Sequence, residues 1–477
     1  MIFKSIGWAA LQQWGQQGSQ VIVLFVVANI IGPEAIGVLT FANIFMGLAQ
    51  IFINQGYAES LIQSEKLVEA QINTIFWRMM MISGCVFTVF IVAGSLLAWF
   101  QTKDNLGLVL IALAPILFLR PVSQMHSSIA GREMRFKDVA RASVLSSFAG
   151  DLLAVVLALQ GLGLWSLVIS QQVKAILLIL LLTGINQWSP RFEFNAKSVK
   201  HSEQFSRKLF GTNFMAFIGM RADQLIIGTF IGFESLGIYS LVMRLILTLE
   251  TLMMSALNRV FFSVFSRLQQ EKDRILDLYY SGLDILCAAT FPALFGLAVV
   301  GPTLFTNIMG PQWSDSANII WPLSIFMALK TAAYLFYPLQ LGQGRSDLLF
   351  KCATYAALLT IVCSTVAAPF GIVAVAFGVA VRMLIGLAIH VAYANKSMQF
   401  QNFRFLRIVS VNLFNSLVIT IVGVLVMQQL EANWAVKTIL TIATSSMIYL
   451  FLTFFRLDTL RAEVSLLNRW RLDPNDQ

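Results

Sequence analysis

Charged side chains lie inside stretches of this sequence that are otherwise apolar enough to sit in a lipid bilayer. The basic ones are Arg78, Arg120, Lys174, Arg221, Arg244, Lys330 and Arg382, and the acidic ones are Asp151, Asp223, Glu250 and Asp284. Because a charge in hydrocarbon costs about 2.5 kcal/mol or more, each should face a water-filled cavity or a charged partner. Cations outnumber acids here, so a cavity that they line would suit an anionic ligand.

Lys174 and Arg382 fall at equivalent positions of an internal repeat, 208 residues apart, as are Gly163 and Gly371. Each lies about ten residues from the predicted outer end of its span, near the bilayer centre at about 1.5 Å per residue. We expect the two to face a cavity and bind a diphosphate, the arginine as a two-pronged donor and the lysine as a point charge. The alternative for Lys174 is a salt bridge to Asp151, which lies at matching depth in the preceding span.

Three further cations, Arg120, Lys330 and Arg221, are also candidates to line the cavity, and for Lys330 no acid is near in the sequence. Asp223 and Arg244 each lie about eight residues from a shared outer turn, at a rise of about 1.5 Å per residue. Matching depth predicts a structural ion pair between them.

Glutamines crowd the first apolar stretch. Gln13, Gln16, Gln17 and Gln20 recur at helical spacing and would form one polar face. Amides both donate and accept, so this face could bind sugar hydroxyls. The alternative is hydrogen bonding between helices, worth about 0.6 kcal/mol per bond in membranes.

The composition excludes a soluble globular fold. Of 477 residues, 57% are hydrophobic and only 12% are charged, about half the share of a soluble domain. The four cysteines and three histidines have no metal-ligand spacing, and no nucleophile with a neighbouring base is visible. We therefore expect an all-α polytopic membrane protein that is not an enzyme and holds no metal or organic cofactor. The net charge of +9 points to loops facing anionic lipid rather than to nucleic acid.

Fourteen stretches are long enough to span a bilayer, which takes about 20 apolar residues. They run over 8–31, 36–60, 73–100, 106–128, 139–160, 163–185, 208–231, 236–258, 276–301, 318–341, 348–369, 372–394, 406–428 and 433–455. With the N-terminus inside, inward-facing segments hold 24 of the 33 Lys and Arg residues and outward loops hold two. This asymmetry predicts that both termini are cytoplasmic.

The sequence of one half resembles that of the other. Residues 31–37 (IGPEAIG) return as 231–237 (IGFESLG), and Gln50 stands where the second copy has Glu250. Spans 1–6 thus match spans 7–12, and a site is expected between the halves near mid-membrane. The predicted organisation is an N-lobe (1–190), a linker (191–207), a C-lobe (208–395) and a pair of added helices with a tail (396–477).

Several segments together resemble a known family. They are GYAESLIQ (56–63), DQLIIGTFIGFESLG (223–237), NRVFFSVFSRLQ (258–269) and GRSDLLFK (344–351). They are similar to the bacterial lipid-linked polysaccharide flippases of the Wzx type, in the colanic-acid-exporter branch of the multidrug/oligosaccharidyl-lipid/polysaccharide exporter superfamily. The resemblance covers almost the whole chain.

The resemblance implies alternating access by two six-helix lobes and the movement of undecaprenyl-diphosphate-linked oligosaccharide to the outer leaflet. Coupling to H⁺ or Na⁺ is a further expectation, and the intramembrane acids Asp151, Asp223 and Glu250 are candidates either to carry a coupling proton or to form structural pairs. Polysaccharide polymerase and assembly proteins are expected partners. One alternative is a cation-coupled multidrug antiporter of the same superfamily, although the first span carries no acid. Another is a polysaccharide polymerase or ligase, although the longest outward loop, 302–317, is short.

Overall fold

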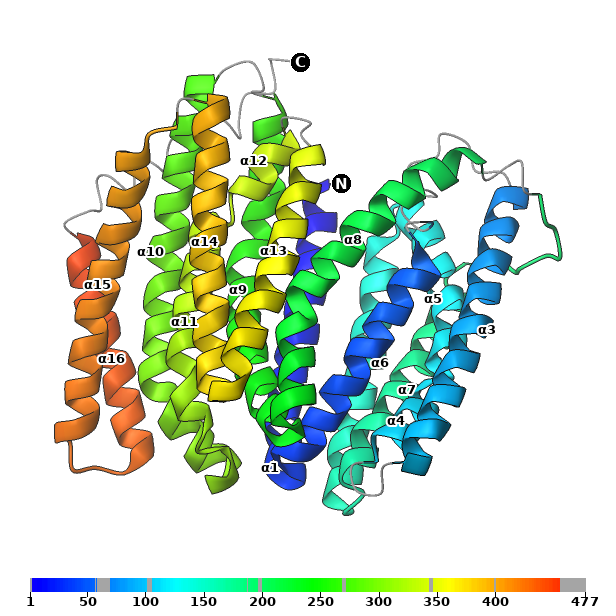
Figure 1. Cartoon of the computed structure of the whole chain (residues 1–477), viewed down its shortest axis with the longest axis horizontal. Coiled ribbons are helices and arrows are strands. Elements are labelled where there is room, and N and C mark those ends of the chain that lie inside the picture. Colours follow the sequence, from blue (N-terminus) through cyan, green and yellow to red (C-terminus); the bar gives the residue numbers. More distant parts are fainter. Residues whose placement is uncertain are drawn as a thin grey trace. The chain divides into compact units, whose positions relative to one another are not determined.

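The computed structural model is built of helices, as the composition predicts (Figure 1). It describes residues 2–55, 57, 69–100, 105–186, 188–195, 200–267, 272–342, 346–398 and 400–454. Within these ranges it does not describe the side chains of 2–22, 24, 200–209, 252–264, 266–267, 272–273, 341–342, 346–347 and 397–398. The predicted all-α polytopic fold class is confirmed.

The chain forms two compact units, residues 1–240 and 241–477. The first contains α1 (Ile2–Asn54), α3 (Glu69–Phe100), α4 (Leu106–Leu113), α5 (Ile116–Arg132), α6 (Phe136–Leu159), α7 (Leu164–Thr183), α8 (Lys200–Ile226), the π-helical turn η2 (Ile227–Ile231) and the start of α9 (Phe233–Arg267). The second contains the rest of α9, α10 (Lys272–Leu304), α11 (Ser316–Ala333), α12 (Phe336–Gly342), α13 (Ser346–Ala367), α14 (Ile372–Met398), α15 (Asn402–Gln429) and α16 (Trp434–Phe454). Short turns η3 (Phe305–Met309), η4 (Pro311–Trp313) and η5 (Ala368–Phe370) connect some of these helices. The predicted lobe, linker and tail boundaries stay predictions.

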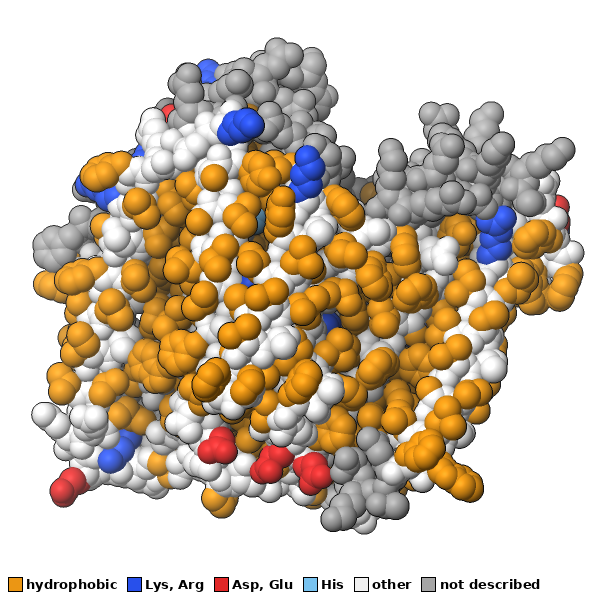
Figure 2. All heavy atoms as spheres, viewed as in Figure 1, with side chains coloured by type: hydrophobic (Ala, Val, Ile, Leu, Met, Phe, Trp, Pro, Cys, Tyr) orange, Lys and Arg blue, Asp and Glu red, His pale blue; other side chains and the backbone are white. Residues whose placement is uncertain are grey.

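Twelve helical segments among the described residues are long and apolar enough to cross a membrane. Each overlaps one of the predicted spans. The other two predicted spans, 8–31 and 236–258, include many residues whose side chains are not described. The total of fourteen therefore stays a prediction. Figure 2 shows the sides of the helices covered largely by hydrophobic side chains, as lipid contact requires.

Glycines bend the chain where the sequence repeats. Gly32 has φ 79° and ψ 171° and divides α1 into two helical segments, the second beginning at Pro33. Gly232 has φ 123° and separates η2 from α9 in the same way. Positive φ is readily adopted by glycine, and proline is well tolerated in the first turn of a helix. Residues 31–37 and 231–237 are therefore two turns of matching geometry, as their sequences predict.

The two turns also contact each other reciprocally within the first unit. A Cβ added to Gly37 would lie 1.7 Å from the carbonyl oxygen of Phe233. A Cβ added to Gly237 would lie 1.9 Å from the carbonyl oxygen of Pro33. Only glycine allows the backbones to approach so closely, as at small-residue interfaces between membrane helices.

One turn further along, the hydroxyls of Thr40 and Ser240 lie 3.1 Å apart. Thr40 and Ser240 are equivalent residues, 200 positions apart. The glycine contacts are equivalent to each other by the same offset, because Gly37 corresponds to Gly237 and Phe233 to Pro33. The sequence repeat is thus also a repeat in the packing.

A proline shapes α5 in the first unit. Pro121 has no N–H, so it leaves the carbonyl oxygen of Leu117 without its helical donor. Ser83 of α3 supplies the missing hydrogen bond to that oxygen. This contact fixes α5 against α3 beside Arg120, the residue that precedes the proline.

In the second unit, one face of α10 makes polar contacts with α15 and α16 at successive turns. These contacts are Asp277 with Arg404 at 2.7 Å, Tyr280 with the N–H of Gln401 at 2.7 Å, Asp284 with Asn412 at 2.6 Å, and the carbonyl of Ala288 with Tyr449. Hydrogen bonds of this kind hold helices together in lipid, where apolar packing has no hydrophobic driving force. The two C-terminal helices, outside the repeat, are therefore attached through α10.

Candidate functional site

A polar cavity of about 370 Å³ lies within the first unit, where α1, α3, α5 and α8 converge. Its lining residues are Gly47, Gln50, Ile51, Ile53, Asn54, Gln55, Met79, Arg120, Gln124, Phe210, Asn213 and Phe217. The cavity is large enough for a sugar ring or a diphosphate rather than for a whole oligosaccharide. It is the candidate functional site.

Arg120 supplies the cavity's positive charge. It lies midway along the span Leu106–Arg132, so its charge is near the centre of a membrane. With its amide oxygen turned toward Arg120, Gln50 accepts hydrogen bonds from Nε and Nη2 at 3.2 Å each. An amide orients the guanidinium but does not neutralise it, since it carries no net charge.

The other polar lining residues are also amides: Asn54, Gln55, Gln124 and Asn213. No carboxylate is present among the described residues that line the cavity. Amides can donate to phosphate oxygens and both donate to and accept from sugar hydroxyls. Together with one guanidinium they make a site for an anionic, hydroxyl-rich ligand.

Four of the five predicted cavity cations lie elsewhere, and the first of them, Lys174, is in a salt bridge. Its Nζ donates to the carboxylate of Asp151, which is buried. Gly150 makes the approach possible, because a Cβ there would lie 2.2 Å from Cγ of Lys174. The alternative prediction for Lys174, a bond between neighbouring helices, describes this contact.

Lys330 likewise has an acidic partner. Its Nζ donates to a carboxylate oxygen of Glu250 at 2.7 Å, and the Glu250 side chain is 9% exposed. This contact joins α9 to α11 across 80 residues of sequence, which is why the sequence alone did not reveal it. Arg382 lies over the ring of Phe326 at 5.6 Å from its centroid. A role of Lys330 or Arg382 in binding a ligand stays a prediction.

Arg221 and Asp223, two further residues predicted from the sequence, both form hydrogen bonds within the first unit. Arg221 donates to Gln224 at 2.9 Å on its own helix, α8. Asp223 is buried and accepts a hydrogen bond from the hydroxyl of Tyr239 at 2.5 Å. The predicted ion pair of Asp223 with Arg244 stays a prediction.

The predicted glutamine face of the first span lies outside the described side chains. Gln13, Gln16, Gln17 and Gln20 are helical in α1, and their side chains are not described. The amides that do line the cavity, such as Gln50, Gln124 and Asn213, were not predicted as site residues. Each is a polar residue within an apolar stretch, and that was the available signal.

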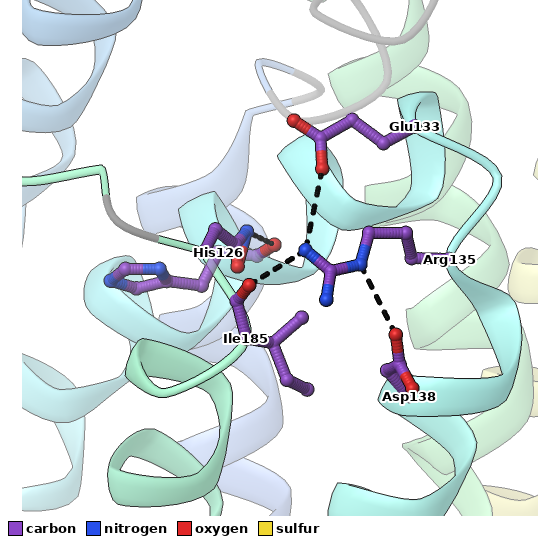
Figure 3. Close-up of polar contacts among 6 residues, drawn as sticks. His126, Glu133, Arg135, Asp138 and Ile185 are labelled. Atoms are coloured by element: carbon purple, nitrogen blue, oxygen red, sulfur yellow. Dashed lines mark hydrogen bonds and ion pairs between the residues drawn. The ribbon is translucent and has the colours of Figure 1, made fainter.

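Arg135 lies in the turn where α5 passes into α6. Figure 3 shows Arg135 reaching to the end of α7, where its Nη1 donates to the carbonyl oxygen of Ile185 at 2.7 Å. The same guanidinium contacts Glu133 at 3.9 Å and Asp138 at 3.1 Å. Close by, the side chain of Asn186 donates to the backbone carbonyl of His126 at 2.7 Å. Arg135 thus fixes a turn between helices.

The chain is similar to proteins of polysaccharide biosynthesis. A family model described as "Polysaccharide biosynthesis protein" matches residues 26–318. The succinoglycan biosynthesis transport protein ExoT of Rhizobium meliloti (strain 1021) is 24% identical over 359 residues, 75% of this chain and 73% of the relative. The teichuronic acid biosynthesis protein TuaB of Bacillus subtilis (strain 168) is 26% identical over 371 residues, 74% of this chain and 75% of the relative.

Among solved structures, the lipid II flippase MurJ in an inward closed conformation is similar in fold. The TM-score is 0.75 at 15% sequence identity, and the match covers 95% of this chain and 100% of that chain. At this identity the likeness concerns the fold. With the family match, it confirms the resemblance that the sequence motifs predict.

Proposed function

Because this chain belongs to the family of polysaccharide biosynthesis proteins, we propose that it is a flippase for a lipid-linked oligosaccharide. The substrate is an undecaprenyl-diphosphate-linked glycan. The protein moves it by alternating access from the cytoplasmic to the periplasmic leaflet of the bacterial inner membrane. Both termini are cytoplasmic, and the chain carries out transport without catalysing a reaction.

The observation that carries this proposal is the cavity around Arg120. A diphosphate is anionic and planar arrays of N–H donors suit its oxygens, so Arg120 is the residue that would bind it. The surrounding amides would contact the first sugar, as neutral hydrogen-bonding groups do. A cavity of about 370 Å³ holds only the part of the glycan nearest the lipid, so longer glycans extend beyond it.

Coupling and partners follow from the same proposal. H⁺ or Na⁺ would drive the cycle, with Asp151, Asp223 and Glu250 as the carboxylates to test. The product at the outer leaflet would pass to polysaccharide polymerase and assembly proteins. The multidrug antiporter alternative needs a carboxylate for a cationic drug, and the described lining residues around Arg120 include none.

A binding experiment with full-length protein in nanodiscs tests the proposal. Undecaprenyl-diphosphate-linked N-acetylglucosamine is compared with undecaprenyl monophosphate and with ethidium, a cationic drug. We expect the diphosphate sugar to bind tightest and to raise the unfolding temperature, since ligands that bind the native state stabilise it. Stabilisation by ethidium alone would overturn the proposal in favour of a drug antiporter.

Arg407→Ala provides the matched control, since this exposed arginine of α15 is distant in sequence from the cavity and does not line it. The control protein should bind the diphosphate sugar as the native protein does. The variant compared with this control is Arg120→Ala, which should bind the diphosphate sugar more weakly. An equal loss of binding in the two variants would mean that the net charge of the protein, rather than the cavity, determines binding.

A further inference from the structure

A second and larger cavity lies in the first unit and shares no residue with the cavity around Arg120. Its volume is about 940 Å³. It lies between the second segment of α1, the end of α3, the start of α4 and the junction of η2 with α9. The residues that line it are Glu34, Phe41, Phe45, Val89, Phe90, Ala93, Leu97, Leu106, Leu110, Gly228, Thr229, Ile231, Gly232, Phe233, Glu234 and Ser235.

Most of this lining is hydrocarbon or aromatic. Phe41 packs edge-on against Phe45 and Phe233, with ring centroids 5.3 and 5.4 Å apart. Val89, which also lines the cavity, is 62% exposed on the lateral surface of α3. A lateral surface of this kind faces lipid chains in a membrane, so the cavity is accessible to hydrocarbon from the bilayer.

The polar part of the lining is acidic. Glu34 and Glu234 are both exposed, and they are equivalent residues of the two repeated turns. No basic side chain is present among the described residues that line the cavity. A ligand that fills it therefore needs a cationic group placed next to a long apolar part.

Backbone donors stand beside these carboxylates. Helical structure begins again at Pro33 after Gly32 and at Phe233 after Gly232, so both glutamates lie in first turns. First turns have N–H groups without helical partners and attract anions. The complementary head group is therefore zwitterionic, with an ammonium for the carboxylates and a phosphate for the N–H groups.

We propose that this cavity binds a phospholipid with a primary ammonium head group, of the phosphatidylethanolamine type. An acyl chain fills the apolar part among Phe41, Phe45 and Phe90, and the ammonium donates to Glu34 and Glu234. A primary ammonium offers three N–H donors, whereas a quaternary ammonium offers none. Hydrogen bonds to charged groups are the stronger ones, so the site discriminates between these head groups.

The location gives this lipid a role in the transport cycle. The cavity borders the turns that meet through Gly37 and Gly237, since Glu34 and Glu234 belong to those turns. A bound lipid contacts both turns at once and thereby favours the conformation in which they touch. In the orientation proposed above, this lipid comes from the outer leaflet.

Native mass spectrometry of the full-length protein tests the inference. The protein is titrated with dioleoyl phosphatidylethanolamine, dioleoyl phosphatidylcholine and dioleoyl phosphatidylglycerol, which share their acyl chains. We expect the ethanolamine lipid to bind about tenfold tighter than the choline lipid, the effect of one charge-assisted hydrogen bond. Equal binding of all three lipids, or preference for the glycerol lipid, would overturn the proposal.

Variants locate the site. Glu34→Gln with Glu234→Gln should remove the preference for the ethanolamine lipid, because amides of the same shape carry no charge. Glu431→Gln, an exposed glutamate between α15 and α16, should leave the preference unchanged. Ala93→Trp should reduce binding of both the ethanolamine and choline lipids by filling the apolar part.

Undiminished preference for the ethanolamine lipid in the double variant would place the lipid elsewhere and refute the assignment. Binding of ethidium in place of lipid, lost in the double variant, would refute it in favour of a drug site.

Discussion

Each of the two repeats carries a cation inside a candidate membrane span, and the two cations have different partners. In the first repeat, Arg120 of α5 contacts the amide of Gln50 in a polar cavity. In the second, Lys330 of α11 donates to the carboxylate of Glu250 at 2.7 Å. Gln50 and Glu250 are equivalent residues, 200 positions apart. The repeats thus differ by an amide in one and a carboxylate in the other.

Under the proposed function, this difference would distinguish a cation that binds the diphosphate from a cation that joins two helices. The carboxylate of Glu250 neutralises Lys330 and leaves little attraction for another anion. The amide of Gln50 holds Arg120 in place and leaves its full charge for a ligand. A duplicated framework can therefore keep one cation for binding and use its counterpart to join helices.

Gln50→Glu gives Arg120 a carboxylate partner, as Glu250 is the carboxylate partner of Lys330. Of the substitutions described here, it should reduce transport the most. The new carboxylate would pair with Arg120 and repel the substrate's diphosphate. Like charges brought together cost several kcal/mol, so we expect transport to fall about 100-fold. The measurement is the flipping rate of a fluorescent undecaprenyl-diphosphate sugar in proteoliposomes. Gln160→Glu, at an exposed position after α6, is the control, and a native rate in Gln50→Glu would contradict the contrast between the repeats.

Arg120→Ala removes the cation that we propose binds the diphosphate. Loss of hydrogen bonds to a charged group costs about 1.5–3 kcal/mol, so binding of the diphosphate sugar should weaken about 10- to 100-fold. The unfolding temperature should change little, because the guanidinium lies in an open cavity. Arg120→Lys should recover part of the affinity, since lysine keeps the charge without the fork. Unchanged affinity in well-folded Arg120→Ala protein would move the binding site away from this cavity.

Gly37→Ala and Gly237→Ala test whether the two repeated turns contact each other symmetrically. Each new methyl group would overlap a backbone carbonyl of the other turn, and overpacking costs about 1–3 kcal/mol. We expect similar losses of thermal stability in the two variants. Gly131→Ala is the control, since a Cβ there meets nothing within 4 Å. A large effect at one glycine and none at the other would show that the contact is not reciprocal in the membrane.

Glu250→Gln gives Lys330 an amide partner in place of its carboxylate, as Gln50 is the amide partner of Arg120. Of the substitutions described here, it should change stability and transport the least. Lys330 loses its partner, but its side chain is 32% exposed, so we expect a loss of about 1 kcal/mol in stability. Transport should stay near the native rate, and Lys330→Met added to Glu250→Gln should recover part of the stability. Abolished transport at native stability would show instead that the pair takes part in coupling.

The salt bridge of Lys174 with Asp151, which was the alternative prediction for Lys174, followed from matching depth in neighbouring spans. Asp151 and Lys174 lie in consecutive antiparallel helices, so equal distance from their shared turn was enough to pair them. Lys330 and Glu250 are 80 residues apart in helices that do not follow each other, and no depth rule selects between several possible neighbours. The turns at 31–37 and 231–237 were predicted as matching, but their mutual contact was not.

The candidate site was predicted only through Arg120. Its amides come from three places in the chain: Gln50 and Asn54 from the end of α1 with Gln55 directly after it, Gln124 from α5 and Asn213 from α8, so no helix alone presents an extended polar face. Periodicity detects residues that share a helix face, whereas a cavity between helices collects one or two residues from each. Arg120 was identified because a lone charge in an apolar span is costly wherever it lies.

The reciprocal glycine contact has a consequence for the origin of the chain. In an unduplicated ancestor of six spans, Gly37 and Gly237 would have been the same residue in two copies of one protein. Each copy would then have met the other across a two-fold axis with its own glycine against the partner's backbone, as in an isologous dimer. Any larger residue at that position would have clashed twice, once in each copy. After gene fusion the two positions could vary separately, and both still hold glycine.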